Sequence, residues 1–393
     1  MGILRISKRR AVHAIYWVMF FVTLHYALSL YINSSYLAQF IAESNVGIVY
    51  TIGALLSIIL LLYSERLVRR RGLYIVTKRT VLIVIGATLL MGAAEWLESP
   101  ILALSSFFLL YLFTLLERYL LDMYLEEYSK DGETGSLRGI FLTVMNGAIL
   151  FSPLMAGFLV SPSGFWRVFL VASFALSIGL FIIIIIFKRM PERKRVASKS
   201  LFSSFWKVMK KSDIRNILGV HFYLQVFYVV MVIYTPIYLN SEIGFSWPMV
   251  GLISAIILSP FVIIQLPLGA IADRWLGEKE LLVAGFLLMA IGTFLLPFIG
   301  HASFALFTLA LLVGRVGAAT VEVMTETYFF KQVNDGEAGI ISLFRNTQPL
   351  AYVIVPALST ILILYFGVRE LFFALATLML FGIYHSLRLK DTR

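Results

Sequence analysis

Long apolar stretches separated by short polar loops dominate the chain. A transmembrane helix needs about 20 mostly apolar residues, and twelve stretches meet that length. They are expected at 12–32, 46–63, 76–96, 101–121, 139–160, 166–187, 215–239, 249–270, 280–299, 303–323, 340–364 and 369–387. The first is too long for a cleaved signal peptide. Because helices satisfy their backbone polar groups internally, the pattern predicts an all-α polytopic membrane protein.

The composition supports lipid as the main solvent of this chain. Of the residues, 60% are apolar and 14% are charged, with a mean hydropathy of +0.89. A soluble protein carries roughly 25% charged residues. The chain has no cysteine, which excludes disulfides and thiolate metal sites. We expect no cofactor and no metal site.

The basic residues are distributed unevenly between alternate loops. Ten Lys and Arg residues lie between Lys188 and Arg215, whereas Arg167 and Arg369 are the only ones in the opposite set of loops. By the positive-inside rule, the protein is expected in the cell membrane with both termini cytoplasmic. The net charge of +11 then reflects topology and contact with the lipid bilayer, and no nucleic acid partner is expected.

The two halves of the chain resemble each other. Matching segments recur in order at offsets between 202 and 208 positions. They include Tyr31-Ile-Asn33-Ser34 with Tyr238-Leu-Asn240-Ser241, Ile85-Gly86 with Ile291-Gly292, Tyr124 with Tyr328, Pro153 with Pro356, and Arg167 with Arg369. Such a repeat predicts two homologous six-helix bundles, 1–187 and 215–393. The basic linker 188–214 joins them, either lying on the membrane face or acting as a regulatory helix.

One loop motif carries a family resemblance. The segment Gly269-Ala-Ile-Ala-Asp273-Arg274-Trp-Leu-Gly277-Glu-Lys279 resembles the signature of the major facilitator superfamily, and the likeness of the two halves extends it to the whole chain. The first-half copy is degraded, with Glu65 in place of the aspartate. The resemblance implies twelve transmembrane helices in two pseudo-symmetric bundles, transport by alternating access, and no enzymatic activity. We expect a monomer.

The resemblance also implies a cytoplasmic gate. Asp273 is expected near the start of the eleventh span, and Arg274 near Glu322 or Glu326. In the first half, Glu65 and Arg66 are expected near acidic or basic residues of the fourth span. The predicted gate residues are Glu65, Arg66, Glu117, Arg118, Asp122, Gly269, Asp273, Arg274, Gly277, Glu322 and Glu326. The alternative is that they only mark the membrane boundary.

The resemblance places a central cavity along the first, fourth, seventh and tenth spans. Polar residues within spans are costly unless they face protein or water. The predicted cavity residues, with some from neighbouring spans, are His25, Ser29, Asn33, Tyr111, Thr114, Asn146, His221, Gln225, Tyr228, Gln265, Arg315, Gln348 and Tyr352. Each is either a substrate contact or an interhelical hydrogen bond.

Arg315 is the most informative of these residues. It lies twelve residues after Ser303, about 18 Å along a helix and near the middle of a roughly 30 Å core. Its acceptor is expected to be a substrate anion, a carbonyl cluster, or a group on another span such as Gln348 or Tyr352.

The leading hypothesis is a secondary active transporter of a small organic solute. Proton coupling would need a titrating group in the membrane, and His25 and Glu322 are candidates. Ser152-Pro153-Leu-Met-Ala156-Gly157 is similar to the antiporter motif of the family, which favours efflux. Uptake of sugars or other nutrients, and a non-transporting sensor with the same fold, remain alternatives. No zinc-binding or phosphate-binding motif supports an enzyme or an ATP-driven pump.

Overall fold

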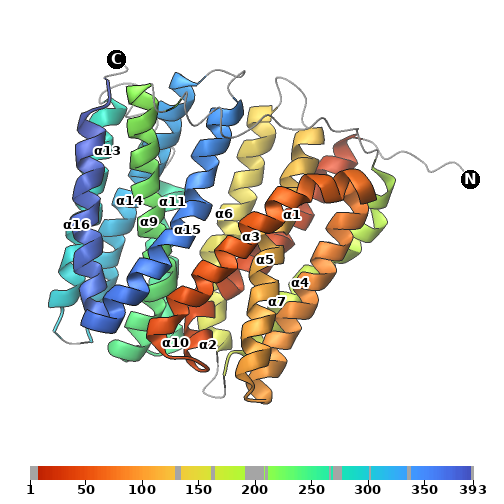
Figure 1. Ribbon diagram of the computed structural model, residues 1–393, viewed down its shortest axis with the longest axis horizontal. Coiled ribbons are helices and arrows are strands. Elements are labelled where there is room, and N and C mark those ends of the chain that lie inside the picture. Colours follow the sequence, from red (N-terminus) through yellow and green to blue (C-terminus); the bar gives the residue numbers. More distant parts are fainter. Residues whose placement is uncertain are drawn as a thin grey trace, which may run out of the picture. The chain divides into compact units, whose positions relative to one another are not determined.

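The computed structural model describes residues 8–128, 134–160, 164–190, 208, 211–264, 267–268, 277–300, 302–333 and 338–390. The elements in these ranges are all helices (Figure 1). Ten of the described helices are long and apolar enough to cross a membrane, and the two shorter apolar helices are Met145–Leu159 and Trp247–Ile263. These twelve correspond to the expected spans, so the predicted all-α polytopic fold is confirmed.

Two compact units make up the chain. The first comprises Met1–Glu43 and Ile52–Ala197, and the second comprises Ser44–Thr51 and Ser198–Arg393. The domain limits expected at residues 187 and 215 remain a prediction.

The first unit consists of α1 (Lys8–Leu30), α2 (Asn33–Ala38), α3 (Glu43–Arg71) apart from its residues Ser44–Thr51, α4 (Leu73–Trp96), α5 (Pro100–Tyr128), α6 (Thr134–Leu159), α7 (Trp166–Ile185) and the short η1 (Phe187–Arg189). Helix α1 packs on α6 and α7, and α4 packs on α5 and α7. Aromatic side chains join α2 to α7, because the Tyr36 ring lies 4.9 Å from that of Phe169. The Tyr36 hydroxyl donates to the Met91 carbonyl at 2.8 Å, which fixes α2 against α4.

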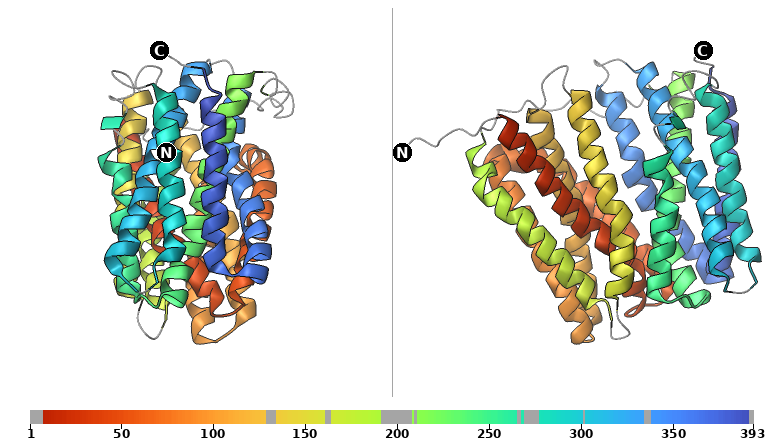
Figure 2. Two further views of the ribbon diagram at one scale, coloured as in Figure 1. Left: turned by 90° about the vertical axis from the view of Figure 1, so that its left-hand side faces the viewer. Right: turned by 180° about the vertical axis from the view of Figure 1, so that it is seen from behind.

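The second unit consists of α9 (Ser212–Ile237), η2 (Tyr238–Glu242), α10 (Trp247–Leu258), α11 (Pro260–Ile263), α13 (Glu278–Leu295), η3 (Leu296–Phe298), α14 (Phe304–Gln332), α15 (Ala338–Phe366) and α16 (Val368–Leu387). Helix α13 packs on α14 and α16, and α9 packs on α14, α15 and α16. Figure 2 shows these long helices running side by side within the unit.

Glycines allow α13 and α14 to cross closely. A Cβ atom on Gly292 would lie 2.5 Å from the Gly314 nitrogen and 2.6 Å from the Ala310 carbonyl oxygen. One on Gly317 would lie 2.4 Å from the Gly285 carbonyl oxygen. Small residues at such crossings are typical of helix packing in membranes. The matching residue of the first half, Gly86, has no neighbouring atom within 4 Å of its Cβ position.

One expected span is interrupted, and another ends within two residues of its expected end. Helix α1 ends at Leu30, and Asn33 begins α2, so Asn33 does not continue the helix of His25 and Ser29. The eighth span, expected as one helix over 249–270, breaks between α10 and α11 at Pro260. Proline has no N–H to donate and its ring clashes with the preceding turn. The Ser259 hydroxyl donates to the Ile256 carbonyl at 2.7 Å and satisfies one of the exposed backbone groups.

Candidate functional site

Arg315 lies inside the second unit on α14. It is 2% exposed. Its guanidinium carbon lies 5.6 Å from the centroid of the Phe227 ring and 6.0 Å from that of Tyr228. Its Nε and Nη2 atoms are buried and have no hydrogen-bond partner. The alternative bond to Gln348 or Tyr352 is therefore not made by these two nitrogens.

A hydrogen-bonded chain runs from α9 to α15. The Thr347 hydroxyl donates to the Phe344 carbonyl at 2.7 Å, so its oxygen accepts from His221 Nδ1–H at 2.6 Å. His221 Nε2 is then an acceptor for the amide of Gln225 at 3.2 Å. The chain fixes His221 as the neutral Nδ1–H tautomer. Of the residues predicted for the cavity, His221 is thus bonded to Thr347 of α15 and to Gln225. The side-chain oxygen of Gln225, Oε1, has no partner.

Acidic residues follow Arg315 along the same face of α14. Glu322 and Glu326 lie seven and eleven residues further on, which at 3.6 residues per turn keeps them on one stripe. Tyr228 of α9 interacts electrostatically with Arg315, Glu322 and Glu326, and Glu326 does so with Arg345 of α15. The second unit therefore gathers polar groups from α9, α14 and α15. On α15, Gln348 is exposed and Tyr352 is half-buried.

The polar residues of α1 and of the start of α2 are buried in the first unit, and only some of their polar atoms have partners. The Thr88 hydroxyl donates to the Val84 carbonyl at 2.8 Å, so it accepts from His25 Nε2–H at 2.8 Å. His25 is fully buried, and its Nδ1 has no partner. Ser29 donates to the Tyr26 carbonyl at 3.1 Å. Asn33 Oδ1 is buried without a partner.

Glu117 on α5 is the other buried charged residue of note. It is 0% exposed, and neither carboxyl oxygen has a hydrogen-bond partner. The neighbouring Arg118 is turned to Tyr26 of α1, with its guanidinium carbon 5.0 Å from the ring centroid. Of the other predicted cavity residues, Thr114 is buried, and Tyr111 and Asn146 are half-buried.

The predicted gate is only partly visible. Outside the described residues lie the side chain of Glu65 and the gate residues Gly269, Asp273 and Arg274. The predicted cavity residue Gln265 lies outside them as well. Arg66 lies over the ring of Tyr63 on its own helix, 5.9 Å from the centroid, and it makes no hydrogen bond to Glu117. Asp122 is exposed on α5. The gate role of these residues stays a prediction.

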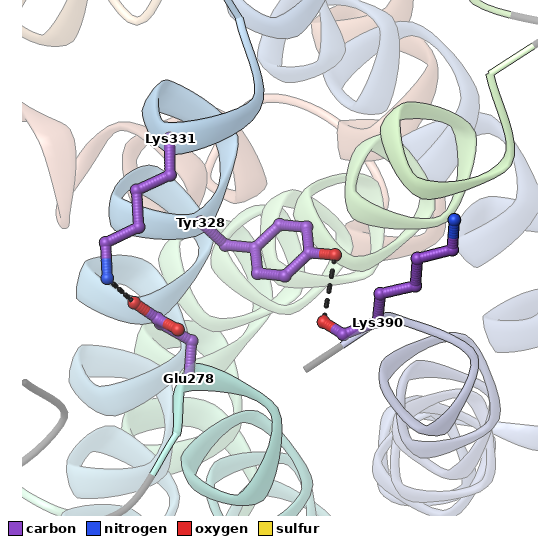
Figure 3. A network of polar contacts seen from close by, with 4 residues as sticks. All are labelled: Glu278, Tyr328, Lys331 and Lys390. Carbon is purple, nitrogen blue, oxygen red and sulfur yellow. Dashed lines mark hydrogen bonds and ion pairs between the residues drawn. The ribbon is translucent and has the colours of Figure 1, made fainter. Parts of the chain in front are cut away.

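A polar network lies where α13 begins, directly after Gly277. Glu278, in the first turn of α13, pairs with Lys331 in the last turn of α14 (Figure 3). Both charges complement the helix dipoles at those ends. The Tyr328 hydroxyl donates to the Lys390 carbonyl at 3.2 Å. This network anchors the ends of α13, α14 and α16 beside the predicted gate.

Comparison with known proteins decides the family. The family model for the Major Facilitator Superfamily matches residues 19–261 and 217–392. The chain belongs to the major facilitator superfamily. Membership makes it a transporter by family rather than an enzyme. No curated protein matches the chain closely enough to count as a relative.

Solved transporters share the fold. A POT family transporter in complex with 5-aminolevulinic acid superposes with a TM-score of 0.76 at 14% identity, covering 96% of this chain and 95% of the other. A D-xylose-proton symporter gives 0.75 at 14% identity and 98% of both chains. A bacterial homologue of the human lysosomal transporter Spinster, in an inward-facing and unoccupied conformation, gives 0.75 at 12% identity and 96% of both chains. At these identities the likeness concerns the fold alone.

Several contributors to the candidate site of this superfamily member were absent from the sequence prediction. Thr88 and Thr347 orient the two histidines, and Glu278 anchors the predicted gate region. The two threonines could have been predicted from the sequence, because polar residues inside spans need partners. Among the described residues, no three His, Asp or Glu side chains are placed to hold a metal ion.

Proposed function

We propose that the chain is a secondary active transporter that moves a small organic solute across the cell membrane by alternating access. The observation that carries the proposal is Arg315, a buried cation on a membrane-spanning helix whose Nε and Nη2 atoms have no hydrogen-bond partner. A charged residue inside the membrane is rare and costly, and usually marks a substrate or ion pathway. The polar groups around it on α9 and α15 support a solute site.

We further propose that a proton gradient drives transport and that Glu117 carries the proton. An ionised carboxylate without a partner is costly in an apolar interior, so Glu117 is stable there only with a proton or a cation bound. A change of conformation that exposes it to water allows release. His25 and Glu322 are the other candidates. The segment from Ser152 to Gly157 supports export as the direction.

Flux measurements in proteoliposomes test the proposal. Labelled solutes are loaded inside the vesicles and a pH gradient is imposed in either direction. We expect efflux to accelerate when protons are higher outside, and to slow when the gradient is dissipated with an ionophore. Solute accumulation driven inward with the protons would identify an uptake permease. Ligand binding without any flux would identify a sensor and overturn the proposal.

The proposed orientation has a direct test because the chain has no cysteine. Single cysteines at Ser44, Ser99 and Ser303 are expected to react with an impermeant maleimide from outside the cell. Cysteines at Ser7, Ser198 and Thr392 are expected to react only after permeabilisation. Outside labelling at position 198 would overturn the cytoplasmic linker. The same samples, in detergent, test the predicted monomer by light scattering.

A further inference from the structure

We infer that the transported solute carries a carboxylate, and that one edge of the Arg315 guanidinium binds both of its oxygens. The role of this contact in transport rests on the proposed function. The binding itself depends only on the geometry around Arg315.

The two nitrogens of Arg315 that have no partner share one edge of the guanidinium. The N–H of Nε and one N–H of Nη2 point the same way in the plane of the group, and both atoms are unpaired. Two parallel donors match the two oxygens of a carboxylate, so the pair binds in a bidentate manner. A lysine in this position would offer no such fork.

Aromatic rings account for the position of Arg315 but not for its donors. The rings of Phe227 and Tyr228 lie 5.6 and 6.0 Å from the guanidinium carbon and stabilise the cation through their π faces. Rings of this kind leave the in-plane N–H groups unsatisfied. Buried donors in native proteins nearly always have partners. The site is therefore incomplete until an anion with two coplanar oxygens occupies the edge.

The surroundings favour a singly charged carboxylate over a phosphate. Glu322 and Glu326 follow Arg315 on the same stripe of α14, and all three interact electrostatically with Tyr228. These acidic residues would repel a dianion more than a monoanion. Gln225 Oε1, one turn from Tyr228 on α9, is a buried acceptor without a partner. It suits a hydroxyl or amine on the same solute.

Binding of matched carboxylates and carboxamides tests the inference. Purified full-length protein in nanodiscs is titrated with benzoate and benzamide, butyrate and butyramide, and succinate monoanion and succinamide, while its melting temperature is followed. Binding to the native state raises that temperature. We expect at least one carboxylate to stabilise the protein and its amide to have no effect. Phenyl phosphate, added as the competing class, is expected to bind more weakly than benzoate.

Variants then assign the effect to Arg315. Arg315→Lys keeps the charge, loses the fork and is expected to weaken carboxylate binding about tenfold or more. Arg315→Gln is expected to abolish the preference for carboxylate over amide. Arg388→Gln is the matched control. Arg388 also lies over a tyrosine, 4.2 Å from the Tyr384 ring centroid, but it is exposed at the end of α16, and its loss is expected to leave binding unchanged.

Three binding results and one transport result would overturn the inference. The binding results are equal stabilisation by acids and amides across the panel, tighter binding of phenyl phosphate than of any carboxylate, and unchanged discrimination in Arg315→Lys. If Arg315→Gln does not fold, the lysine variant still decides. Transport of a solute without a carboxylate by the same protein would leave the proposed function intact and refute only this inference.

Discussion

The helices α5 and α14 correspond to the fourth expected span of each half, and each has 29 residues. They begin 204 positions apart, at Pro100 and Phe304. Each buries a charged residue with side-chain atoms that have no hydrogen-bond partner, but the residue is Glu117 in α5 and Arg315 in α14. At the same offset of 204 positions, Arg118 corresponds in sequence to Glu322. The two helices have the same length, but their buried charges differ in sign and in position, because Glu117 corresponds to Val321 and Arg315 to Tyr111.

The scaffold of the two halves has diverged much less than the charges. Tyr124 of α5 lies against Phe187 after the end of α7, with 4.5 Å between ring centroids. Its counterpart Tyr328 of α14 donates to Lys390 after the end of α16. In both units, the helix of the fourth span thus contacts the segment that follows the helix of the sixth span. The two halves therefore share the position of this contact, whereas they differ in the charges that they bury.

Removing the buried acid is expected to have the largest effect. Glu117→Gln keeps the volume and removes the proton-binding group, so we expect solute flux to become independent of the pH gradient. The free energy of unfolding should fall by about 1–3 kcal/mol at most, because the buried amide is neutral but its N–H donors have no partner. The measurement is flux in proteoliposomes with and without the gradient.

The control for this variant is Glu98→Gln in the same unit, where the side chain is exposed. It should leave gradient-driven flux unchanged. If Glu117→Gln also retained gradient-driven flux, the buried acid of α5 would have no part in coupling, and the contrast with α14 would concern structure only.

Matched glycines offer a second test. Gly292→Ala places a Cβ 2.5 Å from the Gly314 nitrogen, so the α13–α14 crossing must open, at a cost of about 1–3 kcal/mol. Gly86→Ala meets no atom within 4 Å and should stabilise α4 by roughly 0.5–1 kcal/mol. Thermal unfolding of both variants in one detergent measures the difference. Equal shifts of the melting temperature in the two variants would contradict this difference in packing between Gly292 and Gly86.

The smallest effect is expected at the start of α7 and of α16, the helices of the sixth span in each half. The guanidinium of Arg369 donates to the Pro297 carbonyl, whereas Arg167 lies over the Trp166 ring at 5.3 Å. Loss of the hydrogen bond in Arg369→Gln should cost about 0.5–1.5 kcal/mol. Arg167→Gln should cost about 0.5 kcal/mol, the lower end for an exposed cation–π contact. A reversal of this order in thermal melts would mean that the ring contact is the stronger anchor.

Most of the fold could be predicted from the sequence because apolar length alone identifies a spanning helix. The structure confirms helices at the fourth and tenth expected spans, although both become acidic toward their ends. The break at Pro260 could have been predicted from the proline itself, but the spans were predicted only from the length of each apolar stretch. The end of α1 agrees to within two residues with the expected end at residue 32, because the polar run Asn33-Ser34-Ser35 follows it.

The candidate site could be predicted less completely. The depth of Arg315 in its helix follows from counting residues, and its burial agrees with that count. Its neighbours Phe227 and Tyr228 could not be chosen in advance, because partner choice depends on which helix faces meet. For the same reason, the contact of His25 with Thr88 was not foreseen. The sequence shows which polar residues are costly, and the packing shows which of them remain unpaired.

The most direct measurement of the central claim is solute counterflow mediated by Arg315. Proteoliposomes containing the wild-type chain, Arg315→Lys or Arg315→Gln at matched density are preloaded with the carboxylate that stabilises the purified protein best, and uptake of its labelled form is followed. We predict rapid exchange by the wild type, slow exchange by the lysine variant and none above empty vesicles by the glutamine variant. Exchange by Arg315→Gln at the wild-type rate would contradict the account.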